Sequence, residues 1–297
     1  MRVTFSTSFR ETMADVNRAA EELAASERQV SSGRRLNQPS DDPAAASAVI
    51  SDQAALSQID AYLGASDAAT SRLTVVDTTL SDIIDKITAA KTAALGARGS
   101  AQTASQRDAA AAELQGILEA LVGDFNAQFN GAYLFSGTSA TTPPYTMAGG
   151  TVSAYQGNSQ TMAIDTGPGR TTQASFDGRS IAQGSDGEDI FTVLANLVTA
   201  VKAGDSNGIG QGLDALGRAF DRATLAQTQV GISLNGIEAT RAQLTAARLD
   251  VASRISKARD ANMAEAISAM SQDETAYRAA LAAFSRIGSL SLMDYLK

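Results

Sequence analysis

The sequence predicts a mainly α fold: a long antiparallel helical bundle or coiled-coil rod formed by the N- and C-terminal segments, with a small β-rich inserted outer domain. Apolar residues recur every seven positions at both ends of the chain. Alanine is abundant, and aromatic residues make up only 5% of the 297 residues. A Gly-, Thr- and Ser-rich stretch interrupts the helical period in the middle. A strict heptad keeps one apolar stripe facing a partner helix, so we expect the first and last helices to meet.

Two apolar ladders define these terminal helices. The first helix is expected from about Ser8 to Ser32, and it ends at Gly33, which favours a helix C-cap. Its stripe, the N-terminal ladder, comprises Phe9, Val16, Leu23 and Val30. The C-terminal ladder comprises Met263, Met270, Tyr277 and Phe284, with Ile267 and Leu281 beside it. By their period alone, the ladders fit either the core seam of an ordinary helical protein or a surface that neighbouring molecules complete, and their placement at both ends favours the second.

The segment Asn37–Pro43 separates the first helix from a second one, expected from Ala44 toward Leu95. Asp42 is predicted to cap its free N–H groups, with Pro43 in the first turn. The adjacent carboxylates of Asp41 and Asp42 also fit an acid pair or metal ligands, but a helix cap is the favoured interpretation.

A third helix is expected to open at Ser105 and Asp108, which resemble a capping box. Its apolar stripe comprises Leu114, Leu118, Leu121 and Phe125. After it, the stretch Gly131–Gly187 loses the helical period. Within this stretch, Thr151–Tyr155 and Thr161–Ile164 are predicted to form strands around a turn at Gly157–Asn158.

Helical signals return at Asp189, pause at Gly204–Gly208, and predict a final helix from about Leu225 almost to the end. One ladder in it comprises Val230, Ile237, Leu244, Val251 and Ala258. The C-terminal ladder begins five residues later instead of seven. This slip predicts a joint at Asp260–Asn262. Basic residues of this helix, Arg241 and Arg254 among them, either form a solvated face or contact acidic neighbours in an assembly.

Composition argues against most other functions. The chain has no cysteine and no histidine, which removes disulfides, thiol catalysis and the commonest general base and transition-metal ligand. We therefore expect neither an enzyme nor a cofactor site. A net charge of −8 disfavours nucleic acid as a partner. No apolar run is long enough for a membrane span, and the first residues lack the apolar core of a secretory signal.

Three segments resemble one known family. Gln29–Ala45 (QVSSGRRLNQPSDDPAA) resembles the N-terminal signature of bacterial flagellins and of the flagellin-like proteins at the hook–filament junction. Asn130–Thr138 (NGAYLFSGT), followed by Pro143–Tyr145, is similar to the segment that leads into the outer domain of those junction proteins. Ser289–Leu296 (SLSLMDYL) is similar to their terminus rather than to that of a filament flagellin. The resemblance covers nearly the whole chain.

This resemblance implies a structural, non-enzymatic subunit of the extracellular bacterial flagellum, exported without a cleaved signal peptide. Its implied partners are identical subunits in a ring, hook-associated protein 1, flagellin and a cytoplasmic export chaperone. It also implies terminal segments that are poorly ordered in the monomer and form a coiled-coil layer on assembly. A filament flagellin and, ranked lower, a cytoplasmic helical coiled-coil adaptor are the alternatives.

The expected organisation has three parts. Residues 1–42 together with 260–297 form the terminal coiled-coil assembly domain, residues 43–135 together with 188–259 form the helical rod domain, and residues 136–187 form the β-rich outer insertion. The residues expected in the assembly interface are Phe9, Val16, Leu23, Val30, Ser31, Gly33, Arg34, Met263, Ile267, Met270, Tyr277, Leu281, Phe284, Leu292 and Tyr295.

Overall fold

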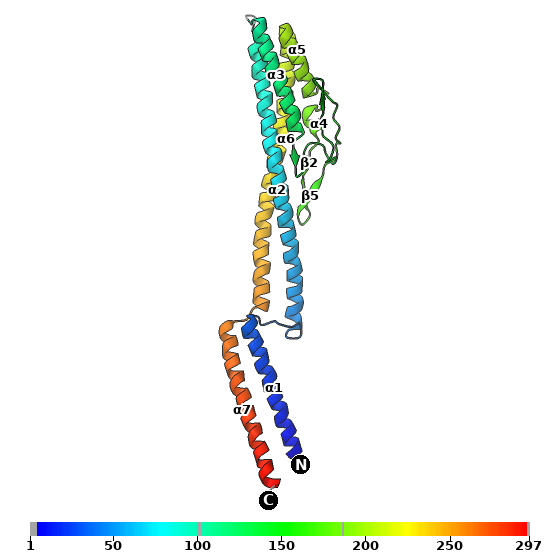
Figure 1. The fold of residues 1–297 in the computed structure, drawn as a ribbon. Coiled ribbons are helices and arrows are strands. Elements are labelled where there is room, and N and C mark those ends of the chain that lie inside the picture. The colour runs from blue at the N-terminus through cyan, green and yellow to red at the C-terminus, as the bar shows by residue number, and fades with distance from the viewer. Residues whose placement is uncertain (1–4, 100–101, 186, 296–297) are drawn as a thin grey trace. The chain divides into compact units, whose positions relative to one another are not determined.

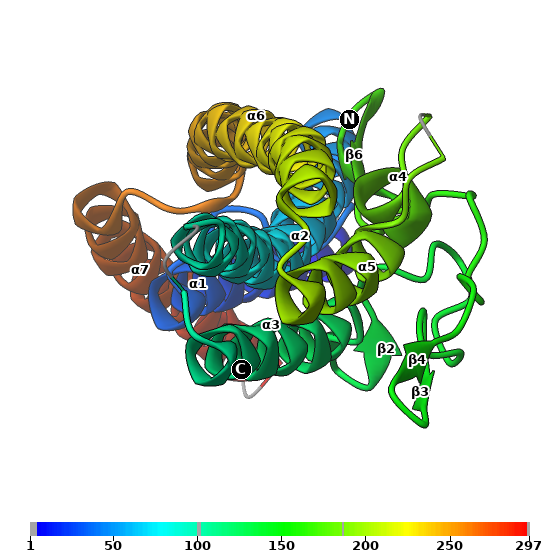
Figure 2. The same ribbon diagram turned by 90° about the horizontal axis from the view of Figure 1, so that it is seen from above.

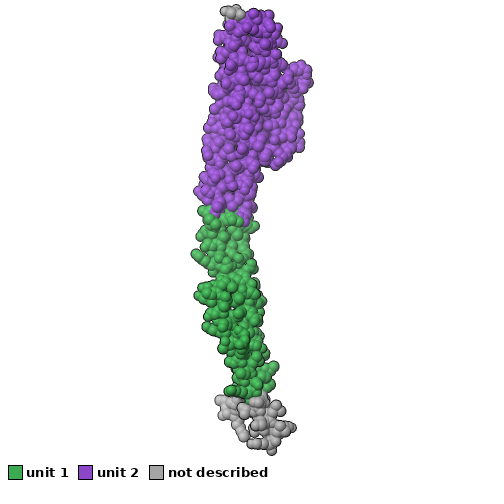
Figure 3. Space-filling view, turned by 60° about the vertical axis from the view of Figure 1, so that its left-hand side comes forward, with its two compact units in different colours: residues 1–59, 246–297 green, residues 60–245 purple. Residues whose placement is uncertain are grey.

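The computed structural model describes residues 5–99, 102–185 and 187–295, apart from the side chains of residues 5, 6, 8 and 287–295. Its helices are α1 (Phe5–Ser32), α2 (Pro43–Ala97), α3 (Ala104–Phe125), α4 (Gly178–Ala182), α5 (Ile190–Ala203), α6 (Ser206–Arg259) and α7 (Met263–Tyr295). The chain divides into two compact units, residues 1–59 with 246–297 and residues 60–245 (Figure 3). Both α2 and α6 contribute to both units.

The main core lies in the unit of residues 60–245, between α2, α3, α5 and α6 (Figures 1 and 2). The predicted apolar stripes of α2 and α3 point into it, and their buried members include Leu73, Leu80, Ile83, Leu114 and Leu118. Burying each such side chain contributes about 1.5–3 kcal/mol. The helical period therefore correctly identified the face of each helix that packs inward.

An aromatic cluster closes this core where α3 ends. The ring of Phe125 lies 5.8 Å from that of Phe135, 5.6 Å from Tyr145 and 5.5 Å from Phe191 between centroids. The ring centroids of Tyr145 and Phe191 lie 4.7 Å apart. Tilted and edge-to-face contacts of this kind add to the free energy gained from burial alone. The cluster joins α3, α5 and the segment between them into one packed body.

The predicted start of α2 is confirmed, and that of α3 is wrong. Asp42 Oδ1 accepts a hydrogen bond of 3.0 Å from the Ala45 amide, and α2 begins at Pro43. The capping box of α3 consists of Thr103 and Gln106, whereas Ser105 and Asp108 lie inside the helix. Thr103 Oγ1 accepts from the Gln106 amide at 3.3 Å, and Gln106 Oε1 accepts from the Thr103 amide at 2.8 Å. A neutral Gln fulfils this reciprocal role as well as an acid does.

Three short antiparallel hairpins make up the β-rich region. They are β1 (Gln128–Phe129) with β2 (Ala132–Tyr133), β3 (Met147–Ala148) with β4 (Thr151–Val152), and β5 (Ala163–Gly167) with β6 (Arg170–Gln173). The predicted pairing of Thr151–Tyr155 with Thr161–Ile164 is wrong. Two consecutive glycines, Gly149 and Gly150, have φ of +59° and +82° and close the tight turn before β4. That turn favours the local partner β3 over a more distant strand.

Gly157–Asn158, the predicted turn, has a different role. The Asn158 amide donates to Ser136 O at 3.2 Å, and its Oδ1 accepts from the Thr138 amide at 3.0 Å. Asn158 therefore holds one loop of the insertion against another, instead of reversing a hairpin.

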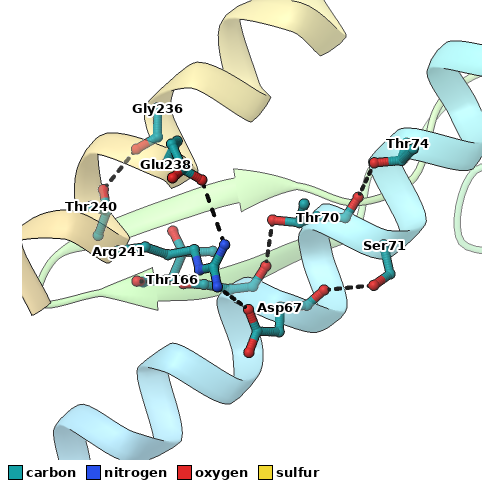
Figure 4. Close-up of polar contacts among 10 residues, drawn as sticks. Asp67, Thr70, Ser71, Thr74, Thr166, Gly236, Glu238, Thr240 and Arg241 are labelled. Carbon is teal, nitrogen blue, oxygen red and sulfur yellow. Dashed lines mark hydrogen bonds and ion pairs between the residues drawn. The ribbon is translucent and has the colours of Figure 1, made fainter. Parts of the chain in front are cut away.

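Polar contacts attach the β5–β6 hairpin to α2 and α6, next to the Arg241–Asp67 ion pair that Figure 4 shows. Ser66 Oγ on α2 donates to Thr166 O at 3.2 Å, and Arg170 Nη1 donates to Thr240 Oγ1 on α6 at 3.2 Å. Beside the hairpin, Arg241 of α6 forms an ion pair of 2.8 Å with Asp67 of α2. This arginine of the basic helix therefore has an acidic neighbour within its own chain.

The C-terminal region differs from its prediction in one respect. Helix α6 begins at Ser206, well before Leu225, and runs for 54 residues. The predicted pause at Gly204–Gly208 is confirmed, because Gly204, with φ of +69°, caps the end of α5 and α6 begins at Ser206. Farther along, α6 approaches α5 at two glycines: a Cβ on Gly212 would be 2.7 Å from Leu197 Cδ1, and one on Gly208 would be 3.0 Å from Ala200 Cβ. These two glycines permit close packing of the two helices. The predicted joint is confirmed, because α6 ends at Arg259 and α7 begins at Met263.

In the unit of residues 1–59 and 246–297, the early part of α2 packs on the last turns of α6. Val49, Val251 and Ile255 form a small apolar core. Arg254 Nη2 forms an ion pair of 2.9 Å with Asp52. Members of the α6 ladder such as Val251 are buried, as the heptad spacing predicted.

Candidate assembly interface

The first and last helices of the chain pack against each other as an antiparallel pair, α1 with α7 (Figure 1). The rings of Phe9 and Phe284 lie 5.0 Å apart between centroids, joining the first residue of one ladder to the last of the other. The predicted meeting of the two terminal helices is confirmed. Seven residues inward along each helix, Val16 and Tyr277 are the next residues of the two ladders.

The pair covers its apolar residues only in part. Phe9, Val16, Leu23 and Val30 are half-buried, and so are Met270, Tyr277 and Phe284. Met263, Ile267 and Leu281 are more open, with 41%, 51% and 41% of their surface exposed. Met13, which the heptad did not single out, is 50% exposed on α1. Among the described side chains of α1 and α7, the only buried apolar residue is Ala266.

Backbone hydrogen bonds connect the segment after α1 to the joint before α7. Ala261 N donates to Gly33 O at 3.0 Å, and Arg35 N donates to Arg259 O at 2.8 Å. Arg34 and Asp260 form an isolated antiparallel bridge. Gly33 ends α1 with φ of +67°, a conformation that side-chain-bearing residues adopt at a cost. The loop after α1 and the joint between α6 and α7 are therefore connected by backbone hydrogen bonds.

Carboxylates stabilise the same loop from within. Asp41 Oδ2 accepts from the amides of Gln38 at 2.8 Å and Asn37 at 2.9 Å, and these bonds lower the pKa of Asp41. The bond from the Ala45 amide lowers the pKa of Asp42. The hydroxyl of Ser256, and then Arg259, lower the pKa of Asp260. Each carboxylate is held in its charged form by donors of the loop or joint, as caps require.

The remaining predicted residues have varied positions. Ser31 and Arg34 are exposed, and Gly33 is half-buried. The side chains of Leu292 and Tyr295 lie outside the described residues. Sequence reasoning missed Arg35, whose Nη2 donates to Ala258 O at 2.8 Å, and the Ser26–Asp273 hydrogen bond between α1 and α7. For Ser26 a signal existed, because it lies three residues after Leu23 on the side that a heptad turns toward its partner.

In the described part of the chain, no group of three or more Asp and Glu side chains is arranged to hold a metal ion. Within the same residues, no helix has both the length and the apolar character needed to cross a membrane.

Comparisons with known proteins identify the family. The bacterial flagellin N-terminal helical region matches residues 6–140, and the bacterial flagellin C-terminal helical region matches residues 213–296. Flagellar hook-associated protein 3 of Salmonella typhimurium is 26% identical, over 82% of this chain and 79% of its own. The protein of the same name from Escherichia coli is 25% identical over 100% of both chains.

Solved structures of similar proteins have the same fold. A putative flagellar hook-associated protein from Vibrio parahaemolyticus is 20% identical and has a TM-score of 0.70, over 74% of this chain and 100% of its own. The flagellar junction protein FlgL from Legionella pneumophila is 14% identical and has a TM-score of 0.62, over 72% of this chain and 100% of its own. The first family region covers α1 to α3 and extends through β1 and β2, and the second covers most of α6 and α7. The chain belongs to the bacterial flagellin family, in the branch represented by flagellar hook-associated protein 3.

Proposed function

We propose that this chain is a structural, non-enzymatic subunit of the bacterial flagellum at the junction of hook and filament, and that the α1–α7 pair is its assembly interface. The observation that carries the proposal is the half-covered state of both ladders. A pair of helices whose described apolar ladder residues remain partly exposed offers a surface on which neighbouring copies can pack. The name of the curated relatives, flagellar hook-associated protein 3, supports the location.

Energetics favour ordering on assembly. Covering four medium-sized side chains per ladder contributes several kcal/mol at about 25 cal/mol per Å². In the isolated chain the same residues stay half-exposed, and their partial burial must offset the entropy of fixing two helices. Stacking against neighbours supplies the missing surface, so the terminal pair gains most of its stability in the assembly.

The proposed partners follow from this role. Identical subunits form a ring, hook-associated protein 1 lies on the hook side, and flagellin lies on the filament side. An export chaperone binds the chain in the cytoplasm before it reaches the extracellular flagellum. In this scheme residues 1–42 with 260–297 assemble, residues 43–135 with 188–259 form the rod, and residues 136–187 are the outer insertion.

The decisive experiment places a charge in both ladders. Leu23→Asp combined with Tyr277→Asp buries two carboxylates in the proposed interface, and we expect the protein to be secreted while hooks lack attached filaments. Ala14→Asp with Thr275→Asp is the matched control, because it adds the same charge at exposed positions of the same helices. Electron microscopy of the cells measures the outcome. Normal filaments and normal swimming in the ladder variant would refute the assembly role.

A second observation separates the alternatives. Immunolabelling of sheared flagella is expected to mark a band at the base of the filament. Labelling along the whole filament, with long polymers formed by the purified protein, would instead favour a filament flagellin. A protein found in the cytoplasm and absent from sheared flagella would favour a helical adaptor.

A further inference from the structure

A heptad ladder cannot specify its own register. The N-terminal and C-terminal ladders each repeat a large apolar residue every seven positions, so sliding α7 along α1 by one heptad again sets apolar residues opposite one another. The apolar contacts of the slipped pair resemble those of the correct pair except at the ends. A directional contact inside the seam makes one register more stable than its neighbours, in addition to the backbone bonds that hold one end of the pair.

The other half of the seam is made of small residues. Three positions after the first three residues of each ladder, α1 has Thr12, Ala19 and Ser26, and α7 has Ala266, Asp273 and Ala280. All six are buried or half-buried, which identifies them as the second line of contact between the helices. Alanine provides no directional contact. Ser26 and Asp273 are polar, and a hydrogen bond joins their side chains across this seam.

Ser26 donates its hydroxyl hydrogen to Asp273 Oδ2 across the pair. Ser26 is 9% exposed, the only polar side chain of α1 and α7 that is buried among those described, and Asp273 is half-buried. A hydrogen bond to a carboxylate inside a partly dry seam is stronger than one in water, and its loss leaves two desolvated polar groups.

We propose that the Ser26–Asp273 hydrogen bond sets the register of the terminal helix pair. The inference rests on the proposed assembly role of that pair. A slip of one heptad that brings Val16 level with Met270 places Ser26 beside Ala266 and Asp273 beside Ala19. Both polar groups then lose their partner, while the ladders lose little. The backbone bonds at Gly33 and Ala261 hold one end of the pair. Farther from that end, where the helices meet through side chains, the Ser26–Asp273 bond favours the correct register over the slipped one.

Disulfide trapping measures this register directly, because the chain contains no cysteine. Val16→Cys with Tyr277→Cys reports the register of the structure. Val16→Cys with Met270→Cys reports the slipped one, since these positions are about 10 Å apart along the axis in the correct pair, beyond the reach of a disulfide. Each reporter pair is expressed in the full-length chain as the cell's only copy. Cross-linking within one chain is then quantified in sheared flagella after mild oxidation.

With Ser26 and Asp273 intact, we expect the first reporter pair to oxidise and the second to stay near background. Ser26→Ala and Asp273→Ala should each raise the slipped cross-link about tenfold, as expected for loss of a hydrogen bond to a charged group. Ser26→Thr keeps the hydroxyl and should restore the background value. Asp15→Ala, which removes an exposed aspartate from the same helix pair, is the control and should have no effect.

The outcomes separate this inference from the proposed function. An unchanged slipped cross-link in both alanine variants, in flagella that still contain the protein, would overturn the register role and leave the assembly role intact. A chain absent from flagella even with Ser26 and Asp273 present would contradict the assembly role instead. Equal slipping in Asp15→Ala would also overturn the inference, because the effect would then follow any loss of charge from the pair.

Discussion

At the scale of single residues, side chains of the same kind have different roles according to what surrounds them. Phe125 is buried among three other aromatic rings, whereas Phe9 meets one ring and remains half-exposed. Phe125 stabilises the core of a single molecule. Phe9 keeps exposed surface that a neighbouring molecule can cover. Sequence spacing identified both as apolar stripe residues but did not separate these roles.

Phe125→Ala is expected to lower the free energy of unfolding by about 3–5 kcal/mol, because it leaves a cavity at the centre of the aromatic cluster. Urea unfolding of the full chain, followed by tyrosine fluorescence, measures this loss. Tyr145→Phe is the control. Tyr145 is 1% exposed, but its hydroxyl has no hydrogen-bond partner among the described residues, so removing it should change stability by less than about 1 kcal/mol. A large effect of the control would contradict this account of the cluster.

Asp41 provides a prediction about pH. Two backbone donors lower the pKa of its carboxyl below the ordinary 3.8. The loop contact is therefore fully present above that value and is lost as the pH falls through the lowered pKa. The amide chemical shifts of Asn37 and Gln38 should titrate together in NMR spectra, with a midpoint below 3.8. In Asp41→Asn this shared titration should disappear, and a midpoint at or above 3.8 in the unmodified chain would refute the contact.

At the scale of elements, helices with equally clear periods differ in how much partner surface the chain itself supplies. The stripe of α3 is fully buried, with Leu114, Leu118 and Leu121 covered by neighbouring helices. The stripes of α1 and α7 have only each other. Periodicity predicts that a helix has a partner, and it does not say whether the partner lies in the same molecule.

Amide hydrogen exchange of the isolated full chain should reflect this difference. We expect α1 and α7 to exchange at least about a hundredfold faster than α3, because little apolar burial opposes their local opening. The same amides should become protected in sheared flagella, where neighbours complete the seam. Equal protection of the amides of all three helices from exchange in the dilute monomer would contradict the proposal that assembly orders the ends of the chain.

At the scale of the whole molecule, the chain combines two compact units with different functions in the proposed scheme. Residues 60–245 contain the large core and the aromatic cluster, and the unit of residues 1–59 with 246–297 contains the terminal pair and a core of three residues. Stability is concentrated in the first, and the surface for association is concentrated in the second. Such a division allows the ends to order on assembly without unfolding the rest.

The amino-acid sequence by itself determined most of the long helices, their inward faces, the meeting of the two ends and the joint near Asp260. These features follow from the spacing of apolar residues along a helix, which is local in the sequence. Only the tertiary structure decided that Thr151 pairs with the strand before it, that Gly212 permits close packing of α6 on α5, and that Ser26 reaches Asp273. Each of these depends on which distant segments come together in space, and no local period encodes that.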